Sequence, residues 1–193
     1  MEGRTHLANQ QYFDRIYRES EDPWRYESSE YETSKYGASL DALPNSQYTN
    51  ALEIGCSIGV FTEKLAPRCA RLLSIDIAVS AVEKAKERCA RFQNVSFRAM
   101  SVPEEYPSGS FDLTVLSEVG YYLSPERLAN LADQITSQAV CGGHLLLVHW
   151  RPSVPGYQLR GDDVHEHFLR IPAWFPTFGS QTDSYRIDVL EWR

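Results

Sequence analysis

The chain has 193 residues, of which 42% are hydrophobic and 23% are charged. This length and composition are those of one globular domain with a core of its own. The formal net charge of −7 argues against a nucleic-acid partner, because proteins that bind nucleic acids usually carry a basic face. No apolar run reaches the roughly 20 residues that span a bilayer, so we expect no membrane partner.

The N-terminal stretch and the cysteines indicate a cytoplasmic protein. The stretch MEGRTHLANQQYFDR lacks the apolar core of a signal peptide. The cysteines do not have the close spacing of a zinc knuckle or a redox pair, so we interpret them as small buried residues in a reducing compartment: Cys56, Cys69, Cys89 and Cys141. His165 and His167 are two residues apart, which puts them on different faces of a helix, and we expect no metal site.

The first 45 residues carry helix patterns without a strand pattern. A stripe of apolar side chains predicts a short first helix: Tyr12, Phe13, Ile16 and Tyr17. Pro23 interrupts this pattern, because a proline disfavours the helical conformation in the residue before it. A second helix is predicted to begin near Ser29, with Glu32 completing a capping box, and to end at Pro44.

From residue 46 onward, strand patterns alternate with helix patterns. Strands are predicted at residues 50–55, 71–77, 95–99, 111–117 and 144–150, with two more within 174–192. This alternation predicts an α/β fold, a Rossmann-like doubly wound sheet of seven mostly parallel strands with helices on both faces. The last two strands would form an antiparallel edge.

Capping residues predict where the helices of this part begin and end. Serine and aspartate side chains accept hydrogen bonds from free amides at helix starts, proline suits the first helical position, and paired glycines stop a helix. The predicted boundaries are Ser80 as an N-cap, Ser124 as an N-cap followed by Pro125, Gly142–Gly143 as a stop, and Asp162 or Asp163 as an N-cap.

The stretch TNALEIGCSIG, residues 49–59, joins the first predicted strand to a glycine-containing loop. In doubly wound sheets, ligands bind beyond the carboxyl ends of the strands, and glycine lets the backbone approach them closely. Asp76 ends the next predicted strand about 20 residues after Gly55, where a carboxylate accepts hydrogen bonds from two ribose hydroxyls. The pattern therefore predicts a ligand that contains a nucleoside.

The spacing of the glycines argues against a dinucleotide. A dinucleotide loop has the pattern G-x-G-x-x-G, whereas the residues between Gly55 and Gly59 are Cys56, Ser57 and Ile58. The loop instead resembles motif I of the class I S-adenosylmethionine (SAM) methyltransferases, in which an acidic residue stands two positions before the first glycine. With Asp76, FDLTVLSEV and GGHLLL, the resemblance covers residues 50–150.

Longer stretches resemble one branch of these enzymes, the NodS family of nodulation methyltransferases. They are LEIGCSIGVFTEKLAPRC, LSEVGYYLS, and the N-terminal DPW followed by a helix. Members of this family use SAM to N-methylate a free amino sugar at the end of a chito-oligosaccharide. The resemblance extends to about residue 150. It implies SAM as cofactor, S-adenosylhomocysteine (SAH) as product, a helical lid over residues 1–45 and a methyltransferase domain over 46–193.

The resemblance also implies a set of cofactor-binding residues. Asp76 would hold the ribose, and Ile77 would lie against the adenine. Ser101 stands where these enzymes often place an aspartate near the adenine amino group, and a hydroxyl is a weaker partner there than a carboxylate. The other implied residues are Glu53, Gly55, Ser57 and Gly59 around the methionine part, Val102 after the third strand, Ser117 after the fourth, and Trp24 in the lid, for which core packing is the alternative.

Candidate catalytic residues follow the central strands. Glu118 ends the fourth strand and could accept a hydrogen bond from an acceptor amine, or could simply fix the loop. His149 and His165 could act as bases, or could be neutral bystanders. The candidate acceptor-binding residues are Tyr121, Tyr122 and Tyr31.

The sequence therefore predicts a SAM-dependent methyltransferase acting on a small polar molecule or an oligosaccharide. By resemblance, the first choice of acceptor is the amine of an amino sugar or of a glycan-like precursor. O-methylation of a hydroxyl or acid is the close alternative. A nucleotide-dependent oxidoreductase and a SAM-binding protein without catalysis are further alternatives, and the oligomeric state stays open.

Overall fold

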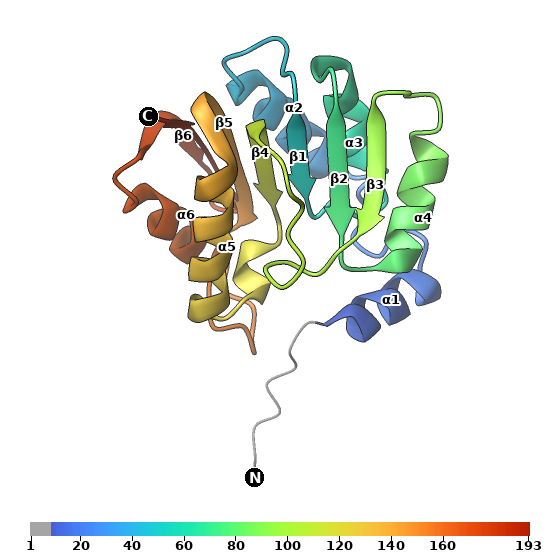
Figure 1. Cartoon of the computed structure of the whole chain (residues 1–193). Helices are drawn as coiled ribbons and strands as arrows, with labels where there is room; N and C mark the ends of the chain where they lie inside the picture. Colours follow the sequence, from blue (N-terminus) through green and yellow to red (C-terminus); the bar gives the residue numbers. More distant parts are fainter. Residues whose placement is uncertain (1–8) are drawn as a thin grey trace.

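A seven-stranded sheet in the order β3-β2-β1-β4-β5-β7-β6 forms the middle of the molecule (Figure 1). The structure is a computed structural model that describes residues 9–193; residues 1–8, where the stretch examined for a signal peptide begins, lie outside the described residues. The strands are β1 (Ala51–Ile54), β2 (Leu72–Asp76), β3 (Val95–Ala99), β4 (Phe111–Ser117), β5 (Ala139–Trp150), β6 (Trp174–Gln181) and β7 (Tyr185–Trp192). Only β7 runs against its neighbours, β5 and β6. The predicted mostly parallel sheet with an antiparallel edge is confirmed.

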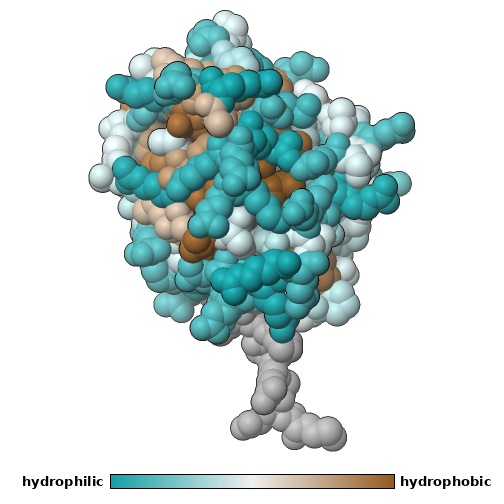
Figure 2. Space-filling view, turned by 90° about the vertical axis from the view of Figure 1, so that its right-hand side faces the viewer, coloured by the Kyte–Doolittle hydropathy of each residue, from teal (hydrophilic) through white to brown (hydrophobic). Residues whose placement is uncertain are grey.

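Helices cover both faces of this sheet, as predicted. They are α1 (Gln10–Glu19), α2 (Glu30–Ala42), α3 (Val60–Leu65), α4 (Val79–Arg88), α5 (Pro125–Gln138) and α6 (Gly161–Leu169), with short 3-10 turns η1 (Ala66–Arg68) and η2 (Gly120–Tyr122). Side chains of α2, α3 and α4 pack on one face of the sheet, and side chains of α5 and α6 pack on the other. The face of the molecule that carries α4 is mostly hydrophilic (Figure 2).

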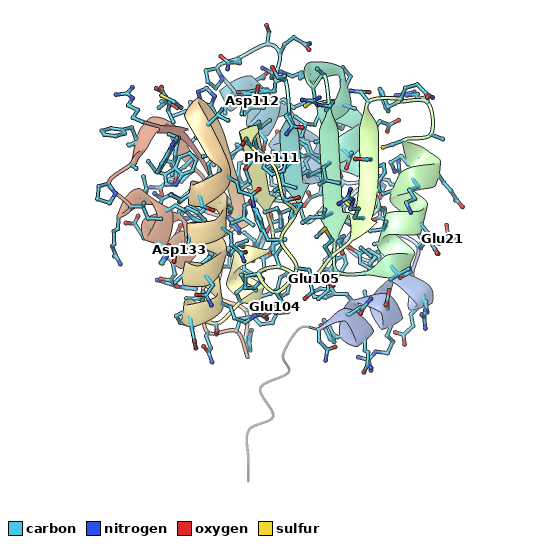
Figure 3. All side chains as sticks on the ribbon, viewed as in Figure 1. Glu21, Glu104, Glu105, Phe111, Asp112 and Asp133 are labelled. Atoms are coloured by element: carbon cyan, nitrogen blue, oxygen red, sulfur yellow. The ribbon has the colours of Figure 1, made fainter. Side chains whose placement is uncertain are left out.

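The central strands are buried on both sides, which explains their nearly continuous apolar sequences. In β4, Leu113 and Val115 belong to the core under α2 and α3, and Leu116 belongs to the core under α5. At the amino end of the same strand, Asp112 accepts hydrogen bonds from the amides of Thr49 and Asn50 and so fixes the entry into β1 (Figure 3). The ligand-binding end of the sheet is the opposite one.

Two of the predicted N-caps are confirmed. Ser124 accepts a hydrogen bond from the amide of Arg127, and Pro125 is the first residue of α5. Ser29 accepts one from the amide of Glu32 at the start of α2. The side chain of Glu32 does not complete the predicted capping box, because it pairs with Lys35 inside the protein.

The predicted cap at Ser80 is wrong, for a reason that links the first helix to the site. Helix α4 begins at Val79, so Ser80 lies inside its first turn. Asp14 of α1 accepts hydrogen bonds from the amide and the hydroxyl of Ser80, at 3.1 and 2.9 Å. A carboxylate is favourable there, because the N-terminus of a helix carries partial positive charge. Asp14 of α1 thus accepts the hydrogen bonds that a capping side chain within α4 would otherwise accept.

Two other predicted boundaries are also wrong. Helix α5 ends at Gln138 and β5 begins at Ala139, so Gly142–Gly143 lies within the strand. The pairing of β4 with β5 is irregular at this point, and glycine is common at such irregularities. In α6 the N-cap residue is Arg160. Asp163, in the first turn of the helix, accepts a hydrogen bond from the amide of Arg160.

Gly59 offers a test of this packing. Its φ is +80°, and an added Cβ would lie 3.0 Å from Cα and Cβ of Ala85 in α4. We therefore predict that Gly59→Ala lowers the free energy of unfolding by about 1–3 kcal/mol, because alanine is strained at positive φ. Gly37 in α2 has open space and an ordinary φ, so Gly37→Ala is the matched control and should raise that free energy by about 0.5–1 kcal/mol. Denaturant unfolding measures both, and equal effects would contradict the prediction.

Candidate active site

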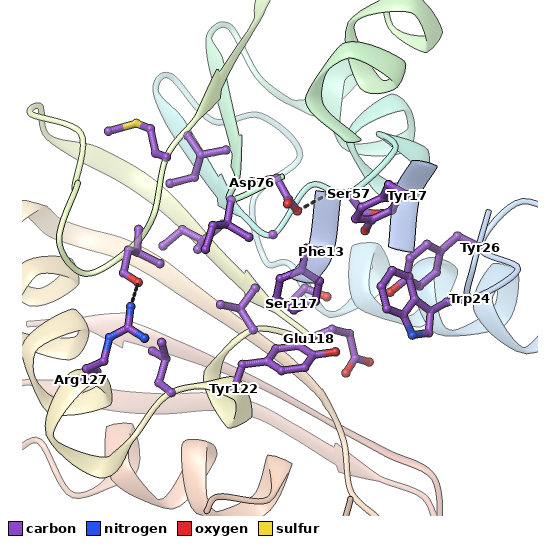
Figure 4. A pocket seen from close by; sticks show the side chains of 18 residues that line it. Phe13, Tyr17, Trp24, Tyr26, Ser57, Asp76, Ser117, Glu118, Tyr122 and Arg127 are labelled. Carbon is purple, nitrogen blue, oxygen red and sulfur yellow. Dashed lines mark hydrogen bonds between the residues drawn. The ribbon is translucent and has the colours of Figure 1, made fainter. Parts of the chain in front are cut away.

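A cavity, here called the first cavity, lies at the carboxyl ends of β1, β2 and β4 (Figure 4). Seven of the residues predicted for the cofactor line it: Gly55, Ser57, Asp76, Ile77, Val102, Ser117 and Trp24. Gly59 and Ser101 lie outside its walls. Gly59 packs against α4, and the amide of Ser101 donates to the side chain of Glu105.

Asp76 holds the glycine loop in place. One of its carboxylate oxygens accepts a hydrogen bond from the amide of Ser57 at 2.9 Å (Figure 4). The other accepts one from the amide of Ala78, also at 2.9 Å. Burial raises the pKa of Asp76, and these amides work against the rise because they favour the charged form. Each oxygen keeps acceptor capacity that faces the cavity. Asp76 can therefore hold the loop and a ligand together.

Gly55 is the position at which the loop requires glycine. Its φ is +89°, and an added Cβ would lie 2.3 Å from the Val119 side chain and 2.8 Å from the carbonyl oxygen of Ser117. No side chain fits between the two loops that follow β1 and β4. This close approach brings both loops to the edge of the first cavity.

Glu53 lies below the glycine loop, in a small recess that shares Gly55, Ser57 and Glu118 with the first cavity. One of its oxygens accepts hydrogen bonds from the hydroxyls of Thr62 and Ser74, at 2.6 and 2.7 Å. Burial raises the pKa of Glu53 to about 7. A positively charged group bound in the recess would lower the pKa of Glu53 and so favour its carboxylate form.

Aromatic residues of the N-terminal segment cover the first cavity. Phe13 and Tyr17 come from α1, and Trp24 and Tyr26 from the loop that follows it. The Tyr17 hydroxyl is 2.6 Å from the hydroxyl of Ser57. Lys84 of α4 donates to the carbonyl oxygen of Tyr17 at 3.0 Å, which adds to the Asp14 contact and fixes α1 beside the cavity.

A second cavity adjoins the first and shares Trp24, Tyr26, Glu118 and Tyr122 with it. The three tyrosines predicted for the acceptor all line it: Tyr31, Tyr121 and Tyr122. The hydroxyl of Tyr31 is buried without a hydrogen-bond partner. Tyrosine and tryptophan rings with polar edges are surfaces that suit sugars and amines.

Glu118 stands between the two cavities and is held by three donors. Its Oε1 accepts from Nζ of Lys35 at 2.7 Å. Its Oε2 accepts from the Tyr121 hydroxyl at 2.7 Å and from the amide of Trp150 at 2.9 Å. A carboxylate offers about four lone-pair positions, so Glu118 can accept one further hydrogen bond.

Lys35 is almost completely buried, with 2% of its side chain exposed, and lies between two carboxylates. Burial works against its charge, but Glu118 and Glu32 outweigh burial and raise the pKa of Lys35. Burial raises the pKa of Glu32, and Lys35 opposes that rise. With all three groups ionised, this trio of Glu32, Lys35 and Glu118 carries one net negative charge at the wall of the second cavity.

The structure does not bring the two predicted bases into either cavity. His149 and His165 are both fully buried, and Nδ1 of His149 lies 3.1 Å from Nε2 of His165. Burial lowers the pKa of each imidazole. Neither side chain lines a cavity, so we withdraw the expectation that either touches an acceptor: the two rings bond to each other, and His165 bonds to Asp188 of β7. Within residues 9–193, there is no cluster of three or more metal-ligating side chains.

Sequence reasoning missed several residues that line the first cavity: Phe13, Tyr17, Tyr26 and Arg127. The aromatic stripe of α1 has the same pattern whether it faces a core or a cavity. Arg127, in the first turns of α5, donates to the carbonyl oxygen of Val102 at 3.1 Å and pairs with Glu104 (Figure 4). Its position next to Val102 follows from the folded loop, and no sequence motif marks it.

Comparison with known proteins identifies the class of the fold. The structure is similar to that of the N-methyltransferase NodS from Bradyrhizobium japonicum WM9 in complex with SAH, with a TM-score of 0.86, 27% identity, and coverage of 95% of this chain and 97% of that one. It is also similar to a putative methyltransferase from Pseudomonas syringae, with a TM-score of 0.73, 31% identity, and coverage of 83% and 98%. The fold is therefore that of a methyltransferase.

The sequence comparison identifies the family. The family model for nodulation protein S (NodS) matches residues 7–148, so the chain belongs to the NodS family, as predicted. Nodulation protein S of Sinorhizobium fredii is 34% identical over 129 residues, which are 66% of this chain and 60% of that protein. Phosphoethanolamine N-methyltransferase 3 of Arabidopsis thaliana is 28% identical over 109 residues, 55% and 22% of the two chains. The chain thus matches about 60% or less of the length of these curated relatives. Among the described residues, no helix has the length and apolar character needed to cross a membrane.

Proposed function

We propose that this protein is a SAM-dependent N-methyltransferase that binds SAM in the first cavity and a small polar amine, of the amino-sugar or glycan-like type, in the second. The observation that carries this proposal is the position of Glu118, which lines both cavities and retains room for one more hydrogen bond. NodS from Bradyrhizobium japonicum, which is similar over nearly the whole chain, is an N-methyltransferase whose structure contains SAH.

The residues of the first cavity fit SAM in three respects. Asp76 presents free acceptor capacity to ribose hydroxyls at the end of β2. Met100, Val102 and Leu123 provide apolar walls for a base. Glu53 offers a carboxyl group in the adjoining recess for the ammonium of the methionine part. Ser101 lies outside the walls and is not among the residues we assign to the cofactor.

The chain supplies alignment and the exclusion of water. SAM, when bound, carries a methyl group that its sulfonium already activates for displacement. The acceptor must therefore react as the free amine, which has lost its proton to solvent before the transfer, with its lone pair pointing at that methyl carbon; proximity supplies much of the rate. We assign to Glu118 the part of accepting a hydrogen bond from the amine and orienting it. We assign to the segment before residue 45 the part of a lid, since Phe13, Tyr17 and Trp24 cover the first cavity.

The charge of the second cavity favours an amine over the alternatives. Two carboxyl groups, of Glu32 and Glu118, and the single amine of Lys35 line this cavity, a set that suits a hydrogen-donating amine better than a carboxylate. A hydroxyl acceptor needs a base to remove its proton, and the two histidines lie outside the cavities. N-methylation therefore stands ahead of O-methylation of a hydroxyl or an acid. We place the activity in the cytoplasm, which suits the free thiols of Cys56, Cys69 and Cys89. These three are buried as predicted, whereas Cys141 is exposed, so the prediction was wrong for that residue.

Calorimetry and methyl transfer test the proposal together. We expect SAM and SAH to bind and NAD not to bind. With labelled SAM, we expect label to enter glucosamine and de-N-acetylated chito-oligosaccharides, but not their N-acetylated forms, whose nitrogen has no free lone pair. NAD binding without SAH binding would indicate an oxidoreductase. SAH binding without transfer to any amine in the panel would indicate a non-catalytic binding protein.

Asp76 and Asp112 form a matched pair for testing the cofactor site. Both carboxylates accept two backbone amides, but only Asp76 lines the first cavity. We predict that Asp76→Ala weakens SAH binding by about 1.5–3 kcal/mol, the range for hydrogen bonds to a charged group. Asp112→Ala should lower thermal stability and leave the SAH affinity unchanged. An Asp76 variant with wild-type affinity would remove Asp76 from the site.

The raised pKa of Glu53 predicts a proton release on binding. With its pKa at about 7, much of Glu53 is protonated at pH 6–7. An arriving ammonium favours the carboxylate, so the pKa falls and a proton leaves, which makes SAH affinity rise with pH over this range. Calorimetry in buffers of different ionisation enthalpy counts the protons. Glu53→Gln keeps the contacts to Thr62 and Ser74 but should abolish the release. A release that persists in this variant would refute the assignment.

A further inference from the structure

A chain of hydrogen bonds runs behind the wall of the second cavity. The amide of Gly120 donates to Nε2 of His149 at 3.3 Å. Nδ1 of His149 lies 3.1 Å from Nε2 of His165, and Nδ1 of His165 lies 2.6 Å from Oδ2 of Asp188. The same oxygen of Asp188 also pairs with Nε of Arg186, at a distance of 2.7 Å. The three side chains between Gly120 and Arg186 are buried.

The partners at the two ends fix the direction of every hydrogen bond. Asp188, paired with Arg186, can only accept, so His165 carries its proton on Nδ1. Nε2 of a neutral His165 then accepts, and His149 must donate from Nδ1. Nε2 of His149 is left to accept the amide of Gly120, which can only donate. Each imidazole therefore has one permitted tautomer and no unpaired nitrogen.

The far end of this chain is the loop that carries the acceptor-binding groups. Gly120 lies between Glu118 and Tyr121, and β5 holds this loop at three successive residues. The carbonyl of Val148 accepts from the amide of Glu118 at 2.9 Å, His149 accepts from Gly120, and the amide of Trp150 donates to the Glu118 carboxylate.

The loop needs such support because its backbone is strained. Glu118 has a φ of 56°, a conformation that residues other than glycine adopt at a cost of about 1–3 kcal/mol. Gly120 packs so closely that an added Cβ would lie 2.5 Å from Val164 of α6. A loop in this conformation persists when its surroundings determine it, and His149 is the side chain that binds its midpoint.

We propose that His149, His165 and Asp188 are positioning residues that, through their fixed tautomers, hold Gly120 and thereby set Glu118 and Tyr121 for the methyl acceptor. The part assigned to the acceptor rests on the proposed function. The histidines thus serve the reaction at a distance, as neutral hydrogen-bond carriers and not as bases.

Nitrogen NMR of the histidine rings in the SAH complex tests the network without any acceptor. Both His149 and His165 should be neutral and protonated on Nδ1, and the amide of Gly120 should exchange slowly with solvent. A charged ring, or a proton on Nε2 of either one, would overturn the proposal.

Two substitutions separate positioning from simple packing. His167→Phe makes the same exchange on the same helix, at a histidine outside the network, and is the matched control, so its kinetics should match the wild type. His165→Phe roughly keeps the ring volume but removes the acceptor for Nδ1 of His149, so the tautomer of His149 that accepts the amide of Gly120 is no longer fixed. We expect His165→Phe to speed the exchange of that amide and to lower kcat/KM for de-N-acetylated chito-oligosaccharide by about 10–100-fold, the scale of a misplaced reacting group. Its SAH affinity should stay at the wild-type value.

A His165→Phe variant with wild-type kinetics, or one whose SAH affinity falls as much as its kcat/KM, would overturn the positioning role. If the wild type methylates no amine at all, the proposed function fails. The ring tautomers and the Gly120 exchange rate then still decide whether the network holds the loop, so the two failures are distinguishable.

Discussion

The carboxylate of Glu118 is the contact on which the arrangement of the site depends. Its three donors come from α2, from the turn after β4 and from the end of β5, so one side chain joins the N-terminal segment to the centre of the sheet. Removing one member of a buried ion pair leaves an uncompensated charge, which costs several kcal/mol. Lys35 and Glu118 therefore have to be kept together, and the N-terminal segment is part of the site.

The two cavities differ in their chemistry because different parts of the chain build them. The first is formed by loops at the ends of parallel strands, where Asp76 holds the glycine loop by its backbone amides and lines the cavity. The second is formed largely by side chains of α2, the turn after β4 and the segment after β5, which bring aromatic rings and the charged trio. A shared cofactor with a variable acceptor is consistent with this division, since the loops of an α/β fold can change while its sheet is retained.

Local patterns predicted the fold, and most of the residues they assigned to a cofactor line a single cavity. Strand and helix periodicity, the glycine loop and Asp76 all depend on residues close together in sequence. Contacts between distant elements escaped prediction. The carboxylate that caps α4 belongs to Asp14 of α1, and the partner of Glu118 is Lys35 of α2. Whether His149 faces the crevice or the interior depends on how α6 packs, which periodicity does not contain.

The shared wall of the two cavities has a thermodynamic consequence. Trp24, Tyr26 and Tyr122 line both cavities. A ligand that orders these rings in one cavity therefore lowers the loss of conformational entropy when a second ligand binds in the other. Occupation of the two cavities is then a linked equilibrium. If one ligand raises the affinity for the second by some factor, the second ligand raises the affinity for the first by the same factor.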